Sequence, residues 1–275
     1  MIVTRFAPSP TGALHLGSAY SALFAHETAR RAGGRFLLRI ENIDIGRCRP
    51  EHERAMLEDL AWLGLRWEEP VRRQSEHMPE YRAALTALDA KGVLYPCFCT
   101  RADIAQAASA PHSAEPVYPG TCRALPKDEA ARRIAEGRPY ALRLDAAKAR
   151  AIAGPLEWRD RARGRFTVDL ADDVVLARKD IGTSYHLAVT LDDHLQGVTL
   201  VTRGEDLLPA TPTHRLLQAL LGLDVPEWHH HRLLTDDAGM RLAKRKDSIS
   251  IKSLRTAGET PESVVGRLGI SIEFS

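Results

Sequence analysis

The sequence predicts a doubly wound α/β fold, in which helices cover both faces of a parallel sheet. Short apolar runs at residues 2–6 and 36–40 have the length and composition of strands. Apolar positions recur at helical spacing over residues 15–29 and again over about 51–63. This order of strand, helix, strand and helix within about 60 residues is typical of parallel strands joined through crossover helices.

Proline and glycine mark the boundaries of these elements. Pro8, Pro10 and Gly12 break the first strand and predict a loop before the first helix. Gly33-Gly34 ends that helix, and Gly64 ends the second one. The boundaries therefore agree with the periodicity.

A different pattern begins near residue 95, where cysteines, prolines and short alternating segments replace the long helices. Alternating runs at residues 140–144, 165–169 and 173–177 predict antiparallel strands. We expect an inserted α+β subdomain between two halves of a nucleotide-binding domain. The expected boundaries are 1–94 for the first half, 95–183 for the insertion, 184–248 for the second half and 249–275 for a helical tail.

The α/β pattern returns near residue 184. The runs at 186–190 and 198–202 predict strands, and residues 212–221 and 261–268 predict helices. A polar, basic loop separates these helices at residues 235–248.

The composition excludes several classes of protein. No run of about 18 or more apolar residues occurs, and the first residues lack the basic and apolar stretches of a secretory signal. We expect a cytoplasmic monomer in which the four cysteines stay reduced. The formal net charge of +2 neither predicts nor excludes a nucleic-acid binder, because local patches matter more than the sum.

The segment from Arg5 to Ser18 has the features of a phosphate-binding end. A helix N-terminus presents free N–H groups and a partial positive charge to an anion. His15 can donate a hydrogen bond to a phosphate oxygen, and Gly17 lets a flat base or ribose approach the backbone.

Several segments together resemble the class I aminoacyl-tRNA synthetases of the glutamyl and glutaminyl branch. His15-Leu-Gly-Ser18 is similar to the HIGH signature of that class, with Ser18 in place of its final His. Arg39-Ile-Glu-Asn-Ile-Asp44 resembles the R-x-E-D-x-D segment of the branch, with Asn42 in place of an Asp. Further segments of the branch are matched in order at Ser184–Ala188, Asp192–His194, Arg203–Leu208 and Gly239–Arg245.

The segment Gly239–Arg245 stands where the branch carries its KMSKS loop. Arg241, Ala243 and Arg245 depart from that pattern, whereas Lys244 keeps the lysine that neutralises charge on the leaving pyrophosphate. The resemblance implies ATP and Mg²⁺, with His15 and Lys244 as catalytic residues. The residues that it implies for ATP binding are His15, Gly17, Ser18 and Lys244.

Glutamate needs a cation for its side-chain carboxylate, and an arginine fork binds a carboxylate through two hydrogen bonds. Arg5 and Arg203 are the candidates. The resemblance implies that both line an L-glutamate pocket, in which ATP activates the amino acid as glutamyl-adenylate. The full implied set is Arg5, Phe6, Ala7, Pro8, Ser9, Glu41, Tyr185 and Arg203, with Ser9 and Glu41 near the α-amino group and Tyr185 covering the pocket.

The cysteines predict a structural Zn²⁺ site. Cys97 and Cys99, together with Cys122 at the end of a loop, can provide three ligands of a tetrahedral ion. His112 is a generic candidate for the fourth ligand. The segment Tyr118-Pro-Gly-Thr-Cys-Arg resembles the zinc site of glutamyl-queuosine tRNA(Asp) synthetases, which implies Tyr118 instead. We interpret Cys48 as a bystander, and we interpret His229-His230-His231 either as structural or as residues that support neighbouring functional side chains.

Three functions remain open. Only about 30 residues follow Arg245, which leaves no room for the anticodon-reading domain of a glutamyl-tRNA synthetase. This length, the ATP motifs and the zinc pattern agree with the glutamyl-queuosine tRNA(Asp) synthetases, whose acceptor is queuosine at the wobble position of tRNA(Asp). The alternatives are a truncated glutamyl-tRNA synthetase that charges a tRNA 3′ end and an inactive paralogue that binds RNA or a partner.

Overall fold

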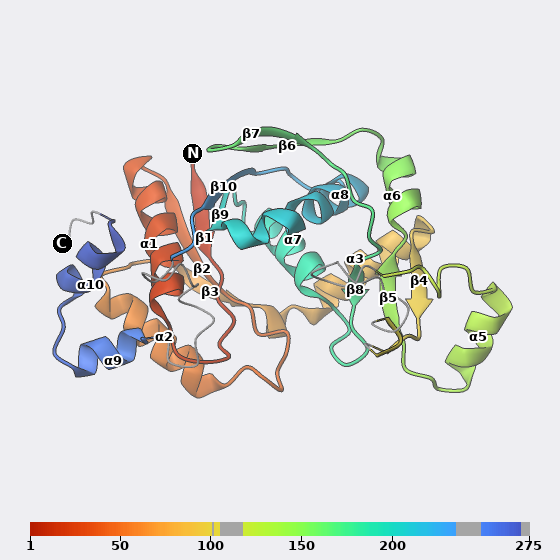
Figure 1. Ribbon diagram of the computed structural model, residues 1–275, viewed down its shortest axis with the longest axis horizontal. Coiled ribbons are helices and arrows are strands. Elements are labelled where there is room, and N and C mark those ends of the chain that lie inside the picture. The colour runs from red at the N-terminus through yellow and green to blue at the C-terminus, as the bar shows by residue number, and fades with distance from the viewer. Residues whose placement is uncertain (101, 105–117, 235–248, 271–275) are drawn as a thin grey trace.

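The computed structural model describes residues 1–100, 102–104, 118–234 and 249–270 (Figure 1). Its first half is a parallel sheet in the order β1-β2-β3, and Val3 on β1 pairs with Arg35 on β2. Helix α1 packs against β1 and β2 and contributes to the same apolar core as α2. The bounds are β1 Val3–Phe6, α1 Leu16–Arg31, β2 Arg35–Ile40, α2 Pro50–Trp62 and β3 Glu68–Arg73.

The second half of the fold contains a four-stranded sheet in the order β7-β6-β10-β9. Strands β9, β10 and β6 are parallel, whereas β7 pairs antiparallel with β6. The predicted α/β fold on parallel strands is therefore confirmed. The bounds are β6 Glu157–Asp160, β7 Gly164–Thr167, β9 Leu200–Gly204 and β10 Glu227–His231.

The two halves meet where β1 lies beside β9 (Figure 1). The backbone N–H of Thr199 donates to the carbonyl of Val3 at 3.0 Å, and the N–H of Val3 donates to Thr199 Oγ1 at 2.9 Å. In both halves the strand order runs outward from this junction. Ligands of open α/β sheets bind outside the carboxyl ends of strands at such a point.

A group of helices packs beside the second half of the sheet. Helix α7 contacts both α3 and α8, and all three contribute to one apolar core. The bounds are α3 Met78–Ala90, α7 Tyr185–Leu195 and α8 Thr211–Leu221, with short 3₁₀ turns η1 Gln74–Glu76 and η2 Glu205–Ala210.

The prediction of a strand at residues 186–190 is wrong, because these residues belong to α7. The side chain of Ser184 caps the helix by accepting a hydrogen bond from the N–H of Leu187. The run is buried at Leu187, Ala188 and Val189. It therefore shows neither the two-residue alternation of a half-buried strand nor the 3.6-residue period of a helix with one buried face. A short, continuously buried run does not distinguish a strand from a helix.

A smaller antiparallel sheet in the order β4-β5-β8 lies at the opposite end of the molecule from α9 and α10 (Figure 1). The β6–β7 hairpin lies in sequence within the expected insertion, yet it pairs with the larger sheet. The expected domain boundaries stay a prediction. The bounds here are β4 Leu94–Cys97, α5 Lys127–Ala135, β5 Ala141–Leu144, α6 Ala146–Ala153 and β8 Val175–Ala177.

The tail helices α9 Ile251–Thr256 and α10 Pro261–Leu268 pack on the core formed by α1 and α2. The N–H of Ile251 donates to the carbonyl of Leu14 at 2.8 Å, and Ser250 forms an isolated β-bridge with His15. The tail is therefore joined to the loop that begins α1. None of the helices in the described ranges has the length and apolar character needed to cross a membrane.

Two adjacent carboxylates on α7 connect the first three strands. Asp193 accepts from Arg5 of β1 at 2.9 Å and contacts Arg39 of β2 at 2.8 Å. Asp192 contacts Arg72 of β3 at 2.8 Å, and it lies 3.8 Å from Arg39. Asp192 also accepts from the side chains of Gln74 and Tyr81.

We predict that Asp192→Ala lowers the free energy of unfolding by about 3–5 kcal/mol, because it takes one carboxylate from two buried arginines and leaves the side chains of Gln74 and Tyr81 without their acceptor. Urea denaturation provides the measurement. Glu68→Ala is the control, since Glu68 pairs with Arg35 at the surface and its loss should barely move the midpoint. Equal midpoints for Asp192→Ala and the wild type would contradict the prediction.

Candidate functional site

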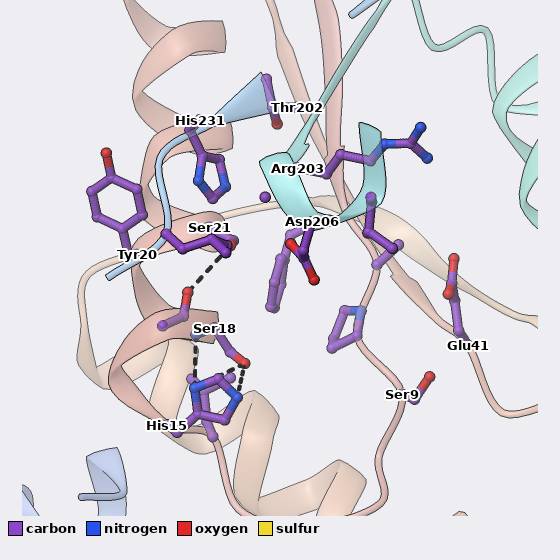
Figure 2. Close-up of a pocket in the computed structure, with 18 of the residues that line it drawn as sticks. Ser9, His15, Ser18, Tyr20, Ser21, Glu41, Thr202, Arg203, Asp206 and His231 are labelled. Atoms are coloured by element: carbon purple, nitrogen blue, oxygen red, sulfur yellow. Dashed lines mark hydrogen bonds between the residues drawn. The ribbon is translucent and has the colours of Figure 1, made fainter. Parts of the chain in front are cut away.

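A cavity of about 500 Å³ opens at the carboxyl ends of β1 and β9 (Figure 2). The β1–α1 loop, the start of α1, the end of β2 and the residues after β9 and β10 form its walls. Lys244 lies outside the described residues. Every other residue predicted for glutamate or ATP lines the cavity, namely Arg5, Phe6, Ala7, Pro8, Ser9, His15, Gly17, Ser18, Glu41, Tyr185 and Arg203.

One end of the cavity is the N-terminus of α1. The Nδ1 atom of His15 accepts from the backbone N–H of Ser18 at 3.1 Å, which leaves the ring proton on Nε2. That nitrogen lies 2.9 Å from Ser18 Oγ. Burial lowers the pKa of His15, so the ring is a neutral donor at neutral pH. A side chain at Gly17 would lie 3.2 Å from the His15 ring, so the absence of a side chain leaves this ring its space.

The described residues on either side of residues 235–248 lie at the cavity wall and at this helix terminus. Leu234, the last described residue before the segment, lines the cavity. Ser250, just after it, is bridged to His15. The chain therefore leaves the cavity wall and returns to it on either side of residues 235–248.

The Arg5 guanidinium is already engaged within the protein. Its Nε and Nη2 atoms donate to the Asp193 carboxylate at 2.9 and 3.4 Å, and Nη1 donates to the Thr202 carbonyl at 3.1 Å. Burial would raise the pKa of Asp193, but Arg5 and Arg39 more than offset this and lower it. The charge of Arg5 is thus largely compensated.

Glu41 lies on the wall at the end of β2 (Figure 2). It is buried, and its nearest cationic partner is Arg39 at 3.4 Å. Burial raises the pKa of this carboxyl to about 7, although Arg39 and Arg5 act in the opposite direction. A cation bound next to Glu41 would therefore favour its ionised form.

Arg203 has a different environment from Arg5. Its guanidinium donates to Tyr185 Oη at 3.3 Å, to Thr211 Oγ1 at 2.6 Å and to the rings of His214 and His230 at 3.2 and 3.0 Å. All four partners are neutral groups, and within the described ranges Arg203 pairs with no carboxylate. Burial lowers its pKa from the ordinary value, which reflects the cost of a charge held away from water.

Sequence reasoning missed several residues of the cavity wall. Figure 2 shows Thr202, Asp206 and His231 around it. His231 Nδ1 bonds the carbonyl of Arg232 at 2.9 Å, and its Nε2 has no hydrogen-bond partner among the described residues. Strand alternation was the available signal, because β10 must direct His230 and His231 to opposite faces.

The cysteine cluster lies at the end of β4, apart from this cavity. The sulfur atoms of Cys97, Cys99 and Cys122 all lie within 4.8 Å of one another. The Tyr118 hydroxyl is 3.5 Å from Cys97 Sγ and 3.9 Å from Cys99 Sγ. Three thiol sulfurs, which suit zinc, therefore lie close to one another, with a phenolic oxygen next to two of them. Cys48 lies outside the cluster, as predicted.

The groups of the cluster differ in how readily they lose a proton: burial acts to raise the pKa of the Cys122 thiol, but hydrogen bonds from Phe98 and Tyr118 outweigh it and lower that pKa. Burial raises the pKa of the Cys99 thiol to about 11, and burial also raises the pKa of the Tyr118 hydroxyl. Without a cation both keep their protons, so metal binding would release them. His112, the other candidate ligand, lies outside the described residues.

The cavity can hold a molecule with two different ends. The neutral donor of His15 and the N-terminus of α1 suit a phosphate chain. At the other end, the uncompensated Arg203 suits a carboxylate, and Glu41 suits an ammonium group. The geometry fits phosphate chemistry on an amino acid better than a purely structural cavity.

One catalytic family matches nearly the whole of this chain. The family profile described as "tRNA synthetases class I (E and Q), catalytic domain" matches residues 1–274. A protein of Rhodobacter capsulatus named glutamyl-Q tRNA(Asp) synthetase is 49% identical over 98% of this chain and 100% of its own length. A glutamate–tRNA ligase of Coprothermobacter proteolyticus is 37% identical over 98% of this chain but 58% of its own length.

Solved structures of tRNA synthetases are also similar to this chain. A glutamate tRNA ligase of Elizabethkingia meningosepticum, in complex with its amino acid, has a TM-score of 0.75 at 31% identity and covers 94% of this chain and 53% of its own. A Mycobacterium tuberculosis methionyl-tRNA synthetase, with a TM-score of 0.62 at 12% identity over 99% of this chain and 64% of its own, shares the fold alone.

Proposed function

The chain belongs to the class I tRNA synthetases of the glutamate and glutamine branch, and from that premise we propose that it activates L-glutamate with ATP and transfers it to queuosine in tRNA(Asp). The cavity carries this proposal, because a phosphate-binding helix terminus faces an uncompensated arginine across it. The end-to-end similarity to a glutamyl-Q tRNA(Asp) synthetase supports the choice of acceptor.

Arg203 binds the side-chain carboxylate of glutamate in this proposal. Arg5 lies beside it and adds positive potential, although Asp193 engages its guanidinium. Tyr185 covers the amino acid through the hydroxyl that contacts Arg203. Glu41 and Ser9 receive the α-ammonium group, and Phe6, Ala7 and Pro8 form the wall between the two ends.

ATP occupies the end formed by the start of α1. His15 donates from Nε2 to a phosphate oxygen, and the backbone at Gly17 and Ser18 lies against the nucleotide. Lys244, from the segment between Leu234 and Ser250, neutralises the leaving pyrophosphate. Mg²⁺ accompanies the phosphates of ATP.

Activation needs no protein nucleophile. An oxygen of the α-carboxylate of glutamate attacks the α-phosphorus of ATP, and the bond from that phosphorus to the bridging oxygen of the β-phosphate breaks. Glutamyl-adenylate and pyrophosphate result. A hydroxyl of the queuosine cyclopentenediol then attacks the glutamyl carbonyl carbon, so an ester forms, AMP leaves and the hydroxyl proton is released. Positioning and charge stabilisation supply the rate.

The cysteine cluster holds a structural zinc ion in this proposal, with Cys97, Cys99, Cys122 and Tyr118 as ligands. Three sulfur atoms and one phenolic oxygen around one centre support it. The ion would fix the loops that carry its ligands, since no bond of the reaction lies near them.

A second candidate function is the charging of a tRNA 3′ end. The similarity to glutamate–tRNA ligases, of which the chain covers 58%, supports it. Activation of glutamate is common to both candidates, and only the acceptor differs. Both acceptors are tRNAs, and on that ground we propose a cytoplasmic location.

The proposed function predicts pyrophosphate exchange that depends on glutamate, followed by labelling of tRNA(Asp). Purified, zinc-loaded protein is incubated with ATP, radiolabelled glutamate and one of three tRNAs: tRNA(Asp) with queuosine, tRNA(Asp) without queuosine, or queuosine-free tRNA(Glu). Label on the queuosine-containing tRNA alone is the expected result. Label on queuosine-free tRNA(Glu) would favour the second function, and the absence of exchange would exclude both.

We predict that the KM for glutamate rises about tenfold between about pH 8 and pH 6. Burial raises the pKa of Glu41 to about 7, so below that pH the carboxyl is neutral and attracts the substrate ammonium less. Pyrophosphate exchange measures the effect, and the KM for ATP serves as the internal control. Glu41→Gln should give a high KM that no longer varies with pH; a wild-type KM that is flat over this range would contradict the assignment.

We also predict one zinc ion per chain, detectable by elemental analysis. Tyr118→Phe should weaken zinc binding at least about tenfold in a chelator competition, because it removes one of four ligands. His112→Ala is the matched control and should retain the affinity of the wild type. The reverse outcome would assign the fourth ligand to His112.

A further inference from the structure

Arg203 is held by a chain of histidines that begins at a buried carboxylate. Asp160 Oδ2 lies 2.7 Å from His230 Nδ1 and also accepts from the backbone N–H of His230. A carboxylate accepts hydrogen bonds, so it fixes the His230 proton on Nδ1. The Nε2 atom then presents a lone pair to Arg203 Nε at 3.0 Å.

A second histidine pair reaches Arg203 from the other side. His214 Nδ1 lies 3.2 Å from Arg203 Nη1, and it can only accept because a guanidinium has no acceptor. The proton of His214 is therefore on Nε2, which lies 3.2 Å from Nδ1 of His186. The Nε2–H of His214 therefore donates to Nδ1 of His186. The rings of His186, His214 and His230 are thus each fixed in a single neutral tautomer.

A protonated ring could not take either position, because imidazolium offers donors only. The surroundings keep the rings neutral: burial and the charge of Arg203 lower the pKa of both His186 and His230 to about 4. The same two causes lower the pKa of His214 well below its ordinary value.

The neutral partners distinguish Arg203 from the other buried arginines of the cavity region. Arg5 and Arg39 each contact the Asp193 carboxylate within 3 Å. At Arg203 the corresponding positions are occupied by imidazole nitrogens and hydroxyls. The nearest carboxylate along the histidine chain is Asp160, on the far side of the His230 ring.

We infer that His214 and His230 are positioning residues that hold Arg203 through neutral acceptors, and that this neutrality makes the cavity select a carboxylate over a carboxamide. The inference rests on the proposed function, in which Arg203 binds the side chain of glutamate. An arginine already paired with a carboxylate would gain little from a second anion and would accept the amide of glutamine nearly as well. An arginine fixed by neutral acceptors keeps its orientation and its full charge for the substrate.

The test compares two variants of His214 whose new side chains have the same size but differ in charge. His214→Glu places a carboxylate beside Arg203, and His214→Gln places a neutral acceptor of the same length there. For His214→Glu we expect a KM for glutamate raised about tenfold or more, with the KM for ATP within about twofold of the wild type. The preference for glutamate over glutamine, as a ratio of kcat/KM in pyrophosphate exchange, should fall by a similar factor. His214→Gln should keep the preference of the wild type.

The outcomes separate this inference from the proposed function. Absence of exchange in the wild type would overturn the proposed function. An active wild type together with a His214→Glu variant that keeps the glutamate KM and the preference would overturn the inference alone. Loss of preference in both variants would show that shape, rather than charge, matters at this position, and would also overturn it.

A measurement on the unaltered protein covers the case in which His214→Glu does not fold. Nitrogen-15 spectra of histidine-labelled protein report the tautomer of each ring, with His214→Gln and His230→Gln used to assign the signals. At about pH 7 we expect His230 with its proton on Nδ1 and His214 with its proton on Nε2. A cationic or opposite tautomeric form of either ring would contradict the inference.

Discussion

The pair Asp192 and Asp193 is the constraint on which the arrangement of the cavity depends. Two adjacent carboxylates on one helix bind arginines from β1, β2 and β3, so three strands and α7 are fixed relative to one another. The carboxyl ends of β1 and β2 form one wall of the cavity. Burying a carboxylate or a guanidinium is costly unless the charge is paired with good geometry, which makes the geometry of this junction strict. The shape of the cavity therefore depends on the ion pairs of Asp192 and Asp193, although neither carboxylate is proposed to bind a substrate.

The same junction divides the arginines into two kinds. Arg39 and Arg5 are compensated and hold the structure, whereas Arg203 is fixed by neutral rings and hydroxyls. The sequence presents all three as similar basic residues within matched motifs. Their surroundings, rather than their residue type, decide which one keeps its charge for a ligand. This difference supports the proposed direction of the amino acid in the cavity, with its side chain toward Arg203.

Much of the site could be predicted because its residues lie in short segments with a local signature. His15, Gly17 and Ser18 follow a proline-rich loop at a helix start, and the cysteine spacing indicates a metal site. The network of His214, His230 and Asp160 could not be predicted this way, because its members lie in three separate elements and meet only in the folded protein. The sequence pattern at residues 186–190 wrongly predicts a strand inside the helix at residues 185–195, because its buried run has no clear period. Lys244 stays a prediction from sequence.

The uncompensated charge of Arg203 also affects the stability of the whole protein when no ligand is bound. A buried guanidinium without an anionic partner makes the empty protein less stable than a hydrophobic residue would, given comparable packing at that position. Natural selection for thermostability alone would remove such a residue. Its presence is a trade-off in which stability of the empty protein is given up so that a ligand can supply the missing charge. Bound substrate then contributes to the stability of the folded protein, which is most stable while the substrate occupies the cavity.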